Sequence, residues 1–160
     1  MQLEKYSLGT GDRFGKQAKA QLAAIQQAQT EGIPVVPVWN KSNREHTTIG
    51  TTPSDVRHAA DEAIKACGWQ KAYYVDADHI SLENVDTFIE HSDFFTLDVA
   101  DYTGQPASED ATAAFVERYR SYAGELAIEG LEAPLKITEQ QIEETAGKYL
   151  RAVQEAGRLY

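Results

Sequence analysis

Hydrophobic residues in the N-terminal part of the chain occur in four short runs that are typical of β-strands. The runs cover residues 4–11, 33–40, 71–78 and 93–101. The last three are rich in β-branched and aromatic residues, and apolar side chains occupy both faces, as in strands buried inside a parallel sheet. The pattern therefore predicts four strands of one parallel sheet.

Segments with helical periodicity separate these runs. The first covers residues 15–31 and stops at Gly32, a residue type that is common just beyond a helix end. The second begins after Thr52, a good N-cap residue, and continues to Cys67. A third helix is expected between the last two strands, with an apolar face formed by Val85, Phe88 and Ile89.

Strands and helices alternate in this part of the chain, which indicates right-handed crossovers and an α/β fold. The pattern changes after residue 104, so the sequence divides into a βα portion, 1–104, and a helical segment, 105–160. Two helices are expected in that segment, over 108–128 and 138–158. The residues expected to be buried in the second of them are Ile142, Tyr149, Leu150 and Val153.

Four parallel strands are compatible with two architectures. They can form a small doubly wound domain, or the first half of a TIM-like (β/α)8 barrel, which needs about 250 residues. The last predicted helix continues to the final residues without a stop signal, and this favours the half-barrel. Because the outer strands of a half-barrel would be unpaired edges, we expect homodimerisation, association through these edges, or edges covered by the terminal helices.

Composition narrows the classes of partner. The formal net charge is −10, which argues against nucleic acid or an anionic membrane as a partner but leaves a small anionic ligand possible. The only cysteine, Cys67, cannot form an intramolecular disulfide, which is typical of a reducing compartment. The N-terminus resembles no signal peptide, and no apolar stretch approaches membrane-span length. We therefore expect a cytoplasmic location.

Polar residues directly follow each predicted strand, where functional sites form in parallel α/β folds. Because the carboxyl ends of parallel strands meet at one edge of a sheet, these residues are expected to surround one cavity. They are Asp12 and Arg13 after the first strand, Asn40, Lys41, Asn43, Arg44 and Glu45 after the second, Asp76, Asp78 and His79 after the third, and Asp98 and Asp101 after the fourth.

Each of the first two groups has a structural and a functional interpretation. Asp12 and Arg13 form either an ion pair that closes a turn or a site in which Arg13 binds a substrate carboxylate in bidentate fashion. Lys41, Arg44 and Glu45 belong either to a solvated loop or to a binding site. The uninterrupted run of polar residues after the apolar sequence VVPVW favours the site.

The third group is a candidate metal site. Asp76, Asp78 and His79 offer two carboxylates and an imidazole within four residues, a set that suits Mn, Fe, Ni or Zn. The alternative is a turn followed by a helix N-cap. The histidines inside predicted helices, His58 and His91, are expected to be surface residues rather than ligands.

Several catalytic motifs are missing from the sequence. It contains neither GxGxxG after a strand nor GxxxxGK[ST], so it lacks the usual signatures of dinucleotide and P-loop nucleotide sites. GxSxG and HExxH are also absent, so nothing supports covalent serine catalysis or zincin chemistry.

The segments that follow the strands resemble those of a known family. The stretches KYSLGTGDRFGKQAKAQL, VWNKSNREHTTIGT and YYVDADHISLENVDTFIEHSDFFTLDVAD are similar to the N-terminal portion of the tagaturonate epimerase family. The resemblance implies a metal-dependent epimerase of hexuronate catabolism, built on a TIM-like barrel, that interconverts tagaturonate and fructuronate. It also implies that full-length members are more than twice as long as this chain.

The resemblance implies roles for the candidate residues. A retro-aldol and aldol sequence suits this epimerisation, since the inverting carbon is β to the ketone and its proton is not acidic. Such a route needs a base for the hydroxyl and a divalent metal to stabilise developing negative charge. The expected roles are metal ligation by His79 and Asp76, catalysis by Glu45, Lys41 and Asp78, and binding of the sugar acid by Asp12, Arg13, Asn40, Asn43 and Arg44.

Two other functions remain compatible with the sequence. One is a non-catalytic α/β module that binds a sugar acid or a protein partner through the same residues. The other is a different metal-dependent sugar isomerase or an aldolase.

Overall fold

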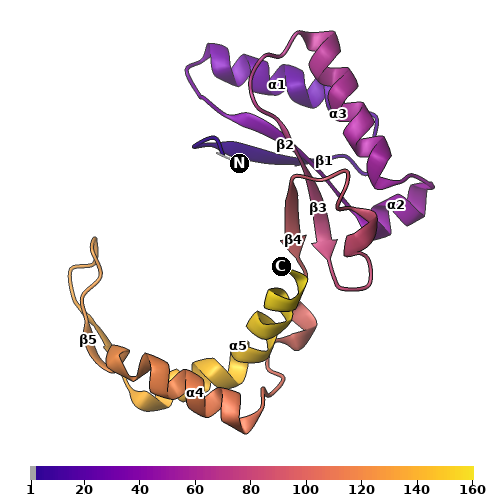
Figure 1. Cartoon of the computed structure of the whole chain (residues 1–160). Coiled ribbons are helices and arrows are strands. Elements are labelled where there is room, and N and C mark those ends of the chain that lie inside the picture. Colours follow the sequence, from indigo (N-terminus) through magenta and orange to yellow (C-terminus); the bar gives the residue numbers. More distant parts are fainter. Residues whose placement is uncertain (1–2) are drawn as a thin grey trace. The chain divides into compact units, whose positions relative to one another are not determined.

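The computed structural model describes residues 3–160, and the chain divides into two compact units between Leu97 and Asp98. The first unit contains a four-stranded parallel sheet, with strands in the order β1-β2-β3-β4 (Figure 1). Its elements, in chain order, are β1 (Ser7–Gly11), α1 (Ala18–Thr30), β2 (Val36–Ser42), α2 (Asn43–Ile49), α3 (Pro53–Cys67), β3 (Tyr74–Ile80), the 3-10 helix η1 (Val85–Thr87) and β4 (Phe94–Leu97).

The predicted α/β fold of parallel βα units is confirmed. Each strand pairs with the next one along the chain, so the order shows no reversal of the kind that marks a doubly wound sheet. An unbroken order of this kind is what consecutive βα units of a barrel produce.

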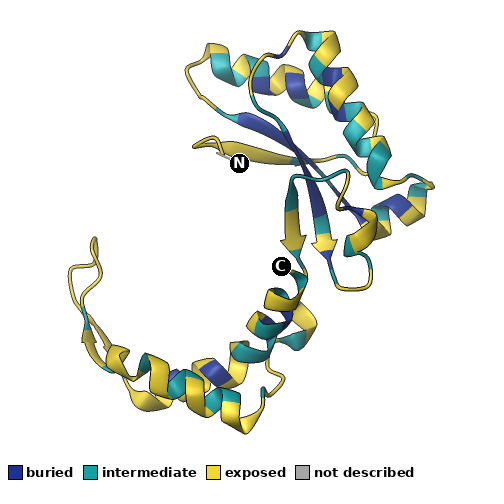
Figure 2. Ribbon diagram, in the orientation of Figure 1, coloured by how far each residue is buried: buried dark blue, intermediate teal, exposed yellow. Residues whose placement is uncertain are grey.

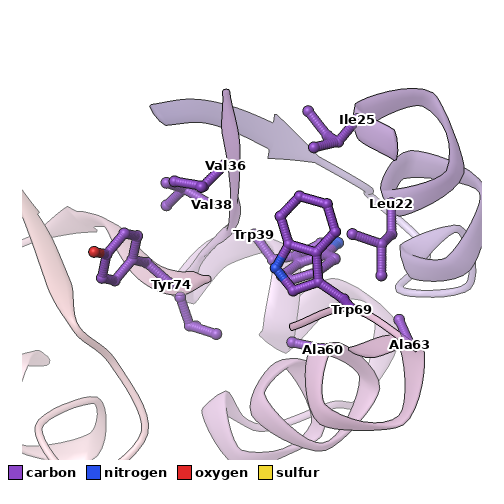
Figure 3. Close-up of a cluster of buried hydrophobic side chains, with 10 residues drawn as sticks. Leu22, Ile25, Val36, Val38, Trp39, Ala60, Ala63, Trp69 and Tyr74 are labelled. Carbon is purple, nitrogen blue, oxygen red and sulfur yellow. The ribbon is translucent and has the colours of Figure 1, made fainter. Parts of the chain in front are cut away.

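The core of the first unit lies between the sheet and the helices α1 and α3, which are neighbours in space (Figure 1). Figure 3 shows Val36 and Val38 on one side of β2 and Trp39 on the side of the helices. Because successive side chains of a strand alternate between faces, Lys41 lies on the same side as Trp39, whereas Asn40 and Ser42 lie with Val38.

Burial follows the position of each strand in the sheet (Figure 2). The central strands β2 and β3 are buried along most of their lengths. The edge strands are more open, and Leu8 of β1 is 50% exposed. This agrees with the near-continuous apolar character that the sequence shows in the central strands.

Two local predictions in this unit were wrong. No α-helix forms between β3 and β4, where only the single turn η1 occurs. The Asn84 side chain accepts a hydrogen bond from the backbone N–H of Ser81 (3.0 Å), and such local bonds compete with helix formation. Phe88 is buried as predicted, but Ile89 is exposed. The short helix α2, directly after β2, was not predicted.

The second unit contains two α-helices and a small antiparallel hairpin. Its elements are η2 (Ala100–Tyr102), α4 (Glu109–Tyr119), η3 (Arg120–Tyr122), β5 (Gly124–Leu126), β6 (Leu135–Ile137) and α5 (Glu139–Leu159). A capping box starts α5, because Thr138 and Gln141 exchange side-chain and backbone hydrogen bonds.

The helix predicted over 108–128 was too long. It ends at Tyr119, and the chain turns into β5 at Gly124, whose φ of 117° glycine adopts readily. The predicted buried face of α5 was also partly wrong, since Tyr149 and Val153 are exposed. The buried residues of α5 are Ile142, Ala146, Ala152 and Glu155.

In the part of the chain that the structure describes, no helix combines the length and the apolar character needed to cross a membrane.

Candidate functional site

The loop between β1 and α1 is organised by Asp12. Its Oδ1 accepts a hydrogen bond from the Phe14 N–H (3.0 Å), and its Oδ2 accepts from the N–H groups of Lys16 and Gln17. Burial opposes ionisation of the carboxyl group, but these backbone hydrogen bonds outweigh it and hold the pKa of Asp12 below its usual value. Asp12 is therefore a carboxylate that fixes the loop leading into α1.

Lys41 anchors the same loop from β2. The residue is only 3% exposed, and its Nζ donates hydrogen bonds to the carbonyl oxygens of Asp12 and Arg13, the latter at 3.0 Å. Two of its three N–H donors thus bind the loop backbone. The Arg13 side chain itself is exposed at the surface of the loop.

The opposite face of the sheet carries a row of polar residues. In the register of β2 and β3, Asn40 is the partner of Asp76, and Ser42 is the partner of Asp78. Paired residues of neighbouring parallel strands project to the same face, so these four side chains form two adjacent layers. Alternation therefore separates Lys41 from the polar row that contains Asn40, Asp76 and Asp78.

Asn40 also closes over the end of β1. A Cβ atom added at Gly11 would lie 3.0 Å from Asn40 Oδ1, a separation that is too tight without movement of the amide. Gly11 thus leaves room for the Asn40 side chain at this edge of the sheet.

The start of α2 is a capping box formed by Ser42 and Glu45. Glu45 Oε2 accepts hydrogen bonds from the backbone N–H and the hydroxyl of Ser42 (both 3.1 Å), while Ser42 Oγ accepts from the Glu45 N–H (3.3 Å). Burial raises the pKa of the Glu45 carboxyl group, but the bonds from Ser42 and the charges of Lys41 and Arg13 lower it more, so the pKa lies below its usual value.

His46 is a buried residue that was not among the predicted site residues. It is 3% exposed, its Nδ1 lies 2.9 Å from Thr51 Oγ1, and its ring lies beside that of Phe88. Burial, with the charge of Lys41, lowers the pKa of the imidazole despite the opposing carboxylates of Asp55 and Glu45. The sequence signal for this residue was weak: a histidine one position beyond the capping pair, in a helix that was not predicted.

Asp76 lies deeper than the other carboxylates of the polar row. Its Oδ2 accepts a hydrogen bond from Thr96 Oγ1 (2.9 Å), whereas its buried Oδ1 has no hydrogen-bond partner among the described residues. Burial, with the nearby charge of Asp78, raises the pKa of the Asp76 carboxyl group despite the Thr96 bond.

Asp78 and His79 form the outer end of the row. Asp78 Oδ2 lies 3.8 Å from His79 Nε2, and the His79 side chain is 63% exposed. His79 has a φ of 55°, and the pairing of β3 with β4 shifts register between Ala77 and Ile80. Such irregularities redirect side chains and cluster at functional sites.

Glu45 follows β2 directly and binds Ser42, and Ser42 is the register partner of Asp78 at the carboxyl ends of β2 and β3. Asn43 and Arg44 lie exposed in the first turn of the adjoining helix α2.

Comparison with known proteins decides the family. A match to the tagaturonate epimerase (UxaE) family covers residues 1–156. This chain belongs to the tagaturonate epimerase family. No curated protein sequence is detectably similar to it.

The structures similar to this member of the tagaturonate epimerase family include fructuronate-tagaturonate epimerase UxaE from Cohnella laeviribosi. The native crystal structure matches with a TM-score of 0.72 at 20% sequence identity, over 97% of this chain and 34% of that one. A form complexed with one glycerol matches with a TM-score of 0.70 at 20% identity, over 93% of this chain and 32% of that one. The likeness shows a shared fold, and this chain spans about a third of the length of those structures.

The resemblance to the tagaturonate epimerase family implies a divalent metal, and the site residues fit it only in part. Asp78 and His79 offer a carboxylate and an imidazole, both suitable ligand types. Catalytic metal sites, however, usually have three protein ligands. Among residues 3–160, no three His, Cys, Asp or Glu side chains are grouped so that they could hold a metal ion. The described residues therefore do not complete a metal site.

Proposed function

We propose that this chain contributes the N-terminal part of the active site of an epimerase that interconverts tagaturonate and fructuronate. The observation that carries the proposal is the match over residues 1–156, and it is supported by the positions of Glu45, Asp78 and His79 in or directly after the carboxyl ends of two neighbouring strands. The carboxyl ends of parallel strands are the usual place for such a site.

The proposed chemistry is cleavage and re-formation of a carbon–carbon bond. A base removes the proton from the hydroxyl on the inverting carbon, and that carbon becomes an aldehyde as its bond to the neighbouring carbon breaks. The electron pair of that bond passes into the ketone fragment as an enolate. Rotation of the aldehyde, re-addition of the enolate and return of the proton give the epimer, and no external oxidant or reductant is consumed.

Glu45 is the proposed base. Its lowered pKa keeps the carboxyl group ionised at neutral pH, and the hydrogen bonds from Ser42 engage only Oε2. Oε1 is then the atom that takes the hydroxyl proton. Lys41 and Asp12 support this site by fixing the loop that carries Arg13.

The other candidates have proposed binding roles. Asn40, Asn43, Arg44 and Arg13 hold the polar groups and the carboxylate of the sugar acid, since guanidinium groups bind carboxylates in bidentate fashion. His79, with Asp78 or Asp76, would contribute ligands to a divalent metal. Such a metal would polarise the ketone of the substrate.

Turnover of tagaturonate tests the proposal, measured with and without added divalent metal on a protein in which this chain is joined to the rest of the active site. We expect NMR spectra of the reaction mixture, recorded after chelation of the metal, to show fructuronate accumulating to equilibrium. The Glu45→Gln variant keeps an oxygen for the capping box but lacks the base, so we expect a loss of turnover without unfolding. Unchanged turnover in this variant would contradict the role of Glu45.

A second candidate function is binding of a sugar acid without catalysis. Two observations favour it: the described residues do not supply a full set of metal ligands, and this chain spans only about a third of the length of the similar epimerase structures. Saturable shifts of Arg13 and Arg44 resonances with tagaturonate, without any product, would support this function over the first.

A further inference from the structure

The loop between β1 and α1 is held in place by hydrogen bonds within the loop and from β2. The Asp12 carboxylate accepts hydrogen bonds from three backbone N–H groups of the loop, including that of Phe14 (3.0 Å). The Asp12 carbonyl oxygen accepts one from the Gly15 N–H (3.1 Å). From the neighbouring strand, Lys41 Nζ donates to the carbonyl oxygens of Asp12 and Arg13. These bonds fix the backbone on each side of Phe14.

Phe14 is the aromatic residue that this loop presents to solvent. Its exposed fraction is 68%, the highest among the large hydrophobic residues of the first unit within residues 3–97. Isolated exposed apolar residues are common on protein surfaces. A mobile loop, however, can fold such a ring against the protein, whereas this pinned loop keeps it in water. Covering the ring with the apolar part of a ligand is therefore favourable.

Arg13, the residue before Phe14, relates this loop to the proposed base. The Arg13 side chain is exposed. Against the effect of burial, the hydrogen bonds from Ser42 lower the pKa of Glu45, and the charge of Arg13 adds to this lowering. Exposed charges act on each other appreciably only within about 10 Å. The guanidinium group thus lies near the Glu45 carboxylate, and Phe14 adjoins it at the carboxyl ends of β1 and β2.

We propose that Phe14 is a substrate-binding residue that contacts the carbon chain of the sugar acid while Arg13 binds its carboxylate. The C–H groups of a sugar carry slight positive charge, which suits the negative face of an aromatic ring. A guanidinium group binds a carboxylate through two parallel hydrogen bonds. This inference rests on the proposed function, and it adds the residue that distinguishes a hexuronate from smaller anions. A small hydroxy acid can satisfy Arg13 but has no chain to cover Phe14.

Binding of two probes tests the proposal, in a protein in which this chain is joined to the rest of the active site. Mannonate has the carboxylate and the carbon chain of a hexuronate but no ketone, so it binds without reacting. Glycolate has the carboxylate and a hydroxyl group but almost none of the chain. Isothermal titration calorimetry gives the affinity for mannonate, and titrations of mannonate in the presence of glycolate give the affinity for glycolate.

Phe14→Ala should weaken mannonate binding by about threefold to tenfold and leave glycolate binding unchanged, because only mannonate covers the ring. Phe14→Tyr keeps the ring and should bind both probes as the unaltered protein does. The matched control is Tyr6→Ala, which removes an aromatic residue that is 51% exposed just before β1, at the other end of that strand. This control should change neither affinity, whereas Arg13→Gln should weaken the binding of both probes.

Three results would overturn the proposal. The unaltered protein fails to bind mannonate, or Phe14→Ala binds mannonate as tightly as the unaltered protein, or Phe14→Ala weakens both probes by the same factor. The last result would indicate a general disturbance of the loop. If Phe14→Ala does not fold, Phe14→Leu makes the same comparison, because it keeps an apolar side chain without the aromatic face.

Turnover of tagaturonate by the unaltered protein separates this inference from the proposed function. Weaker mannonate binding by Phe14→Ala, without any turnover by the unaltered protein, would contradict the epimerase and support the role of Phe14. Turnover by the unaltered protein, with unchanged mannonate binding by Phe14→Ala, would contradict the role of Phe14 alone.

Discussion

Single residues near the strand ends divide into those that hold the loops and those placed for chemistry. The polar side-chain atoms of Asp12 and Lys41 form hydrogen bonds with the loop backbone, and one carboxylate oxygen of Glu45 binds the N-cap of α2. Asp78 and His79 lie further out, where a ligand can reach them. We therefore expect substitutions of the first three to change stability as well as function, and substitutions of the last two to change mainly function.

The proposed metal role of His79 can be measured directly. His79→Ala should weaken binding of a divalent metal such as Zn²⁺ by about tenfold or more, since even residues that only orient ligands affect metal affinity this strongly. Isothermal titration calorimetry of the whole chain provides the affinity. The control is His58→Ala, which removes an exposed histidine of α3. Equal affinities of the two variants would refute a metal role for His79.

Asp76 is expected to lower stability at neutral pH. Its pKa in the folded chain is raised above the unfolded value, so the folded state favours the protonated form and loses stability as the pH rises through that range. Asp76→Asn removes this penalty and should raise the free energy of unfolding at pH 7 by about 1 kcal/mol. Urea denaturation at pH 7 and at pH 3 measures the effect, and the gain should shrink at pH 3. If Asp76→Asn instead lowers the free energy of unfolding at pH 7, the folded protein stabilises the charged Asp76 carboxylate, and this account is contradicted.

At the scale of elements, caps and glycines explain where helices begin and end. The prediction was right where a strong local signal exists, as at Thr52 before α3 and at Thr138 before α5. It failed at Gly124, where the expected long helix gives way to the β5–β6 hairpin.

The capping box of α2 can be tested against a matched one in the second unit. Ser42→Ala removes the hydroxyl that accepts from the Glu45 N–H, and it should lower the free energy of unfolding by about 1 kcal/mol. It also removes the hydroxyl's hydrogen bond to Glu45 Oε2, while the backbone N–H of residue 42 still donates to that oxygen, and so it should raise the pKa of Glu45. Thr138→Ala removes the equivalent cap of α5 and should leave the Glu45 pKa unchanged. NMR titration of the Glu45 side chain distinguishes the two variants, and a Glu45 pKa that does not respond to Ser42→Ala would contradict this account.

At the scale of the whole molecule, the sheet has two open edges. In the described part of the chain, β1 pairs only with β2, and β4 pairs only with β3. Open strand edges are templates for association, and the exposed apolar residues on them, such as Leu8 and Phe95, add to this tendency.

We therefore predict that this chain self-associates through its edge strands. Sedimentation velocity should show dimers or larger species whose fraction rises with protein concentration. Leu8→Lys places a charge on the edge strand β1 and should shift the equilibrium toward monomer. The matched control, Val153→Lys, alters an exposed apolar residue of α5 outside the sheet. A chain that stays monomeric at millimolar concentration would rule out association through these edges.

The sequence by itself determined the elements with strong local signals and the family. Short apolar runs specify the four parallel strands, and long motifs after the strands specify the tagaturonate epimerase family. These features depend on residues close together in the chain, so they can be read without coordinates.

Only the tertiary structure decided which side chains share a space. Strand alternation places Lys41 and Asn40, neighbours in sequence, on opposite faces of β2, and strand register sets Asp78 beside Ser42. The structure also revealed the buried His46, and the buried indole Nε1 of Trp39, which has no hydrogen-bond partner within residues 3–160. The physical reason is that burial, and with it pKa and hydrogen bonding, depends on neighbours that are distant in the chain.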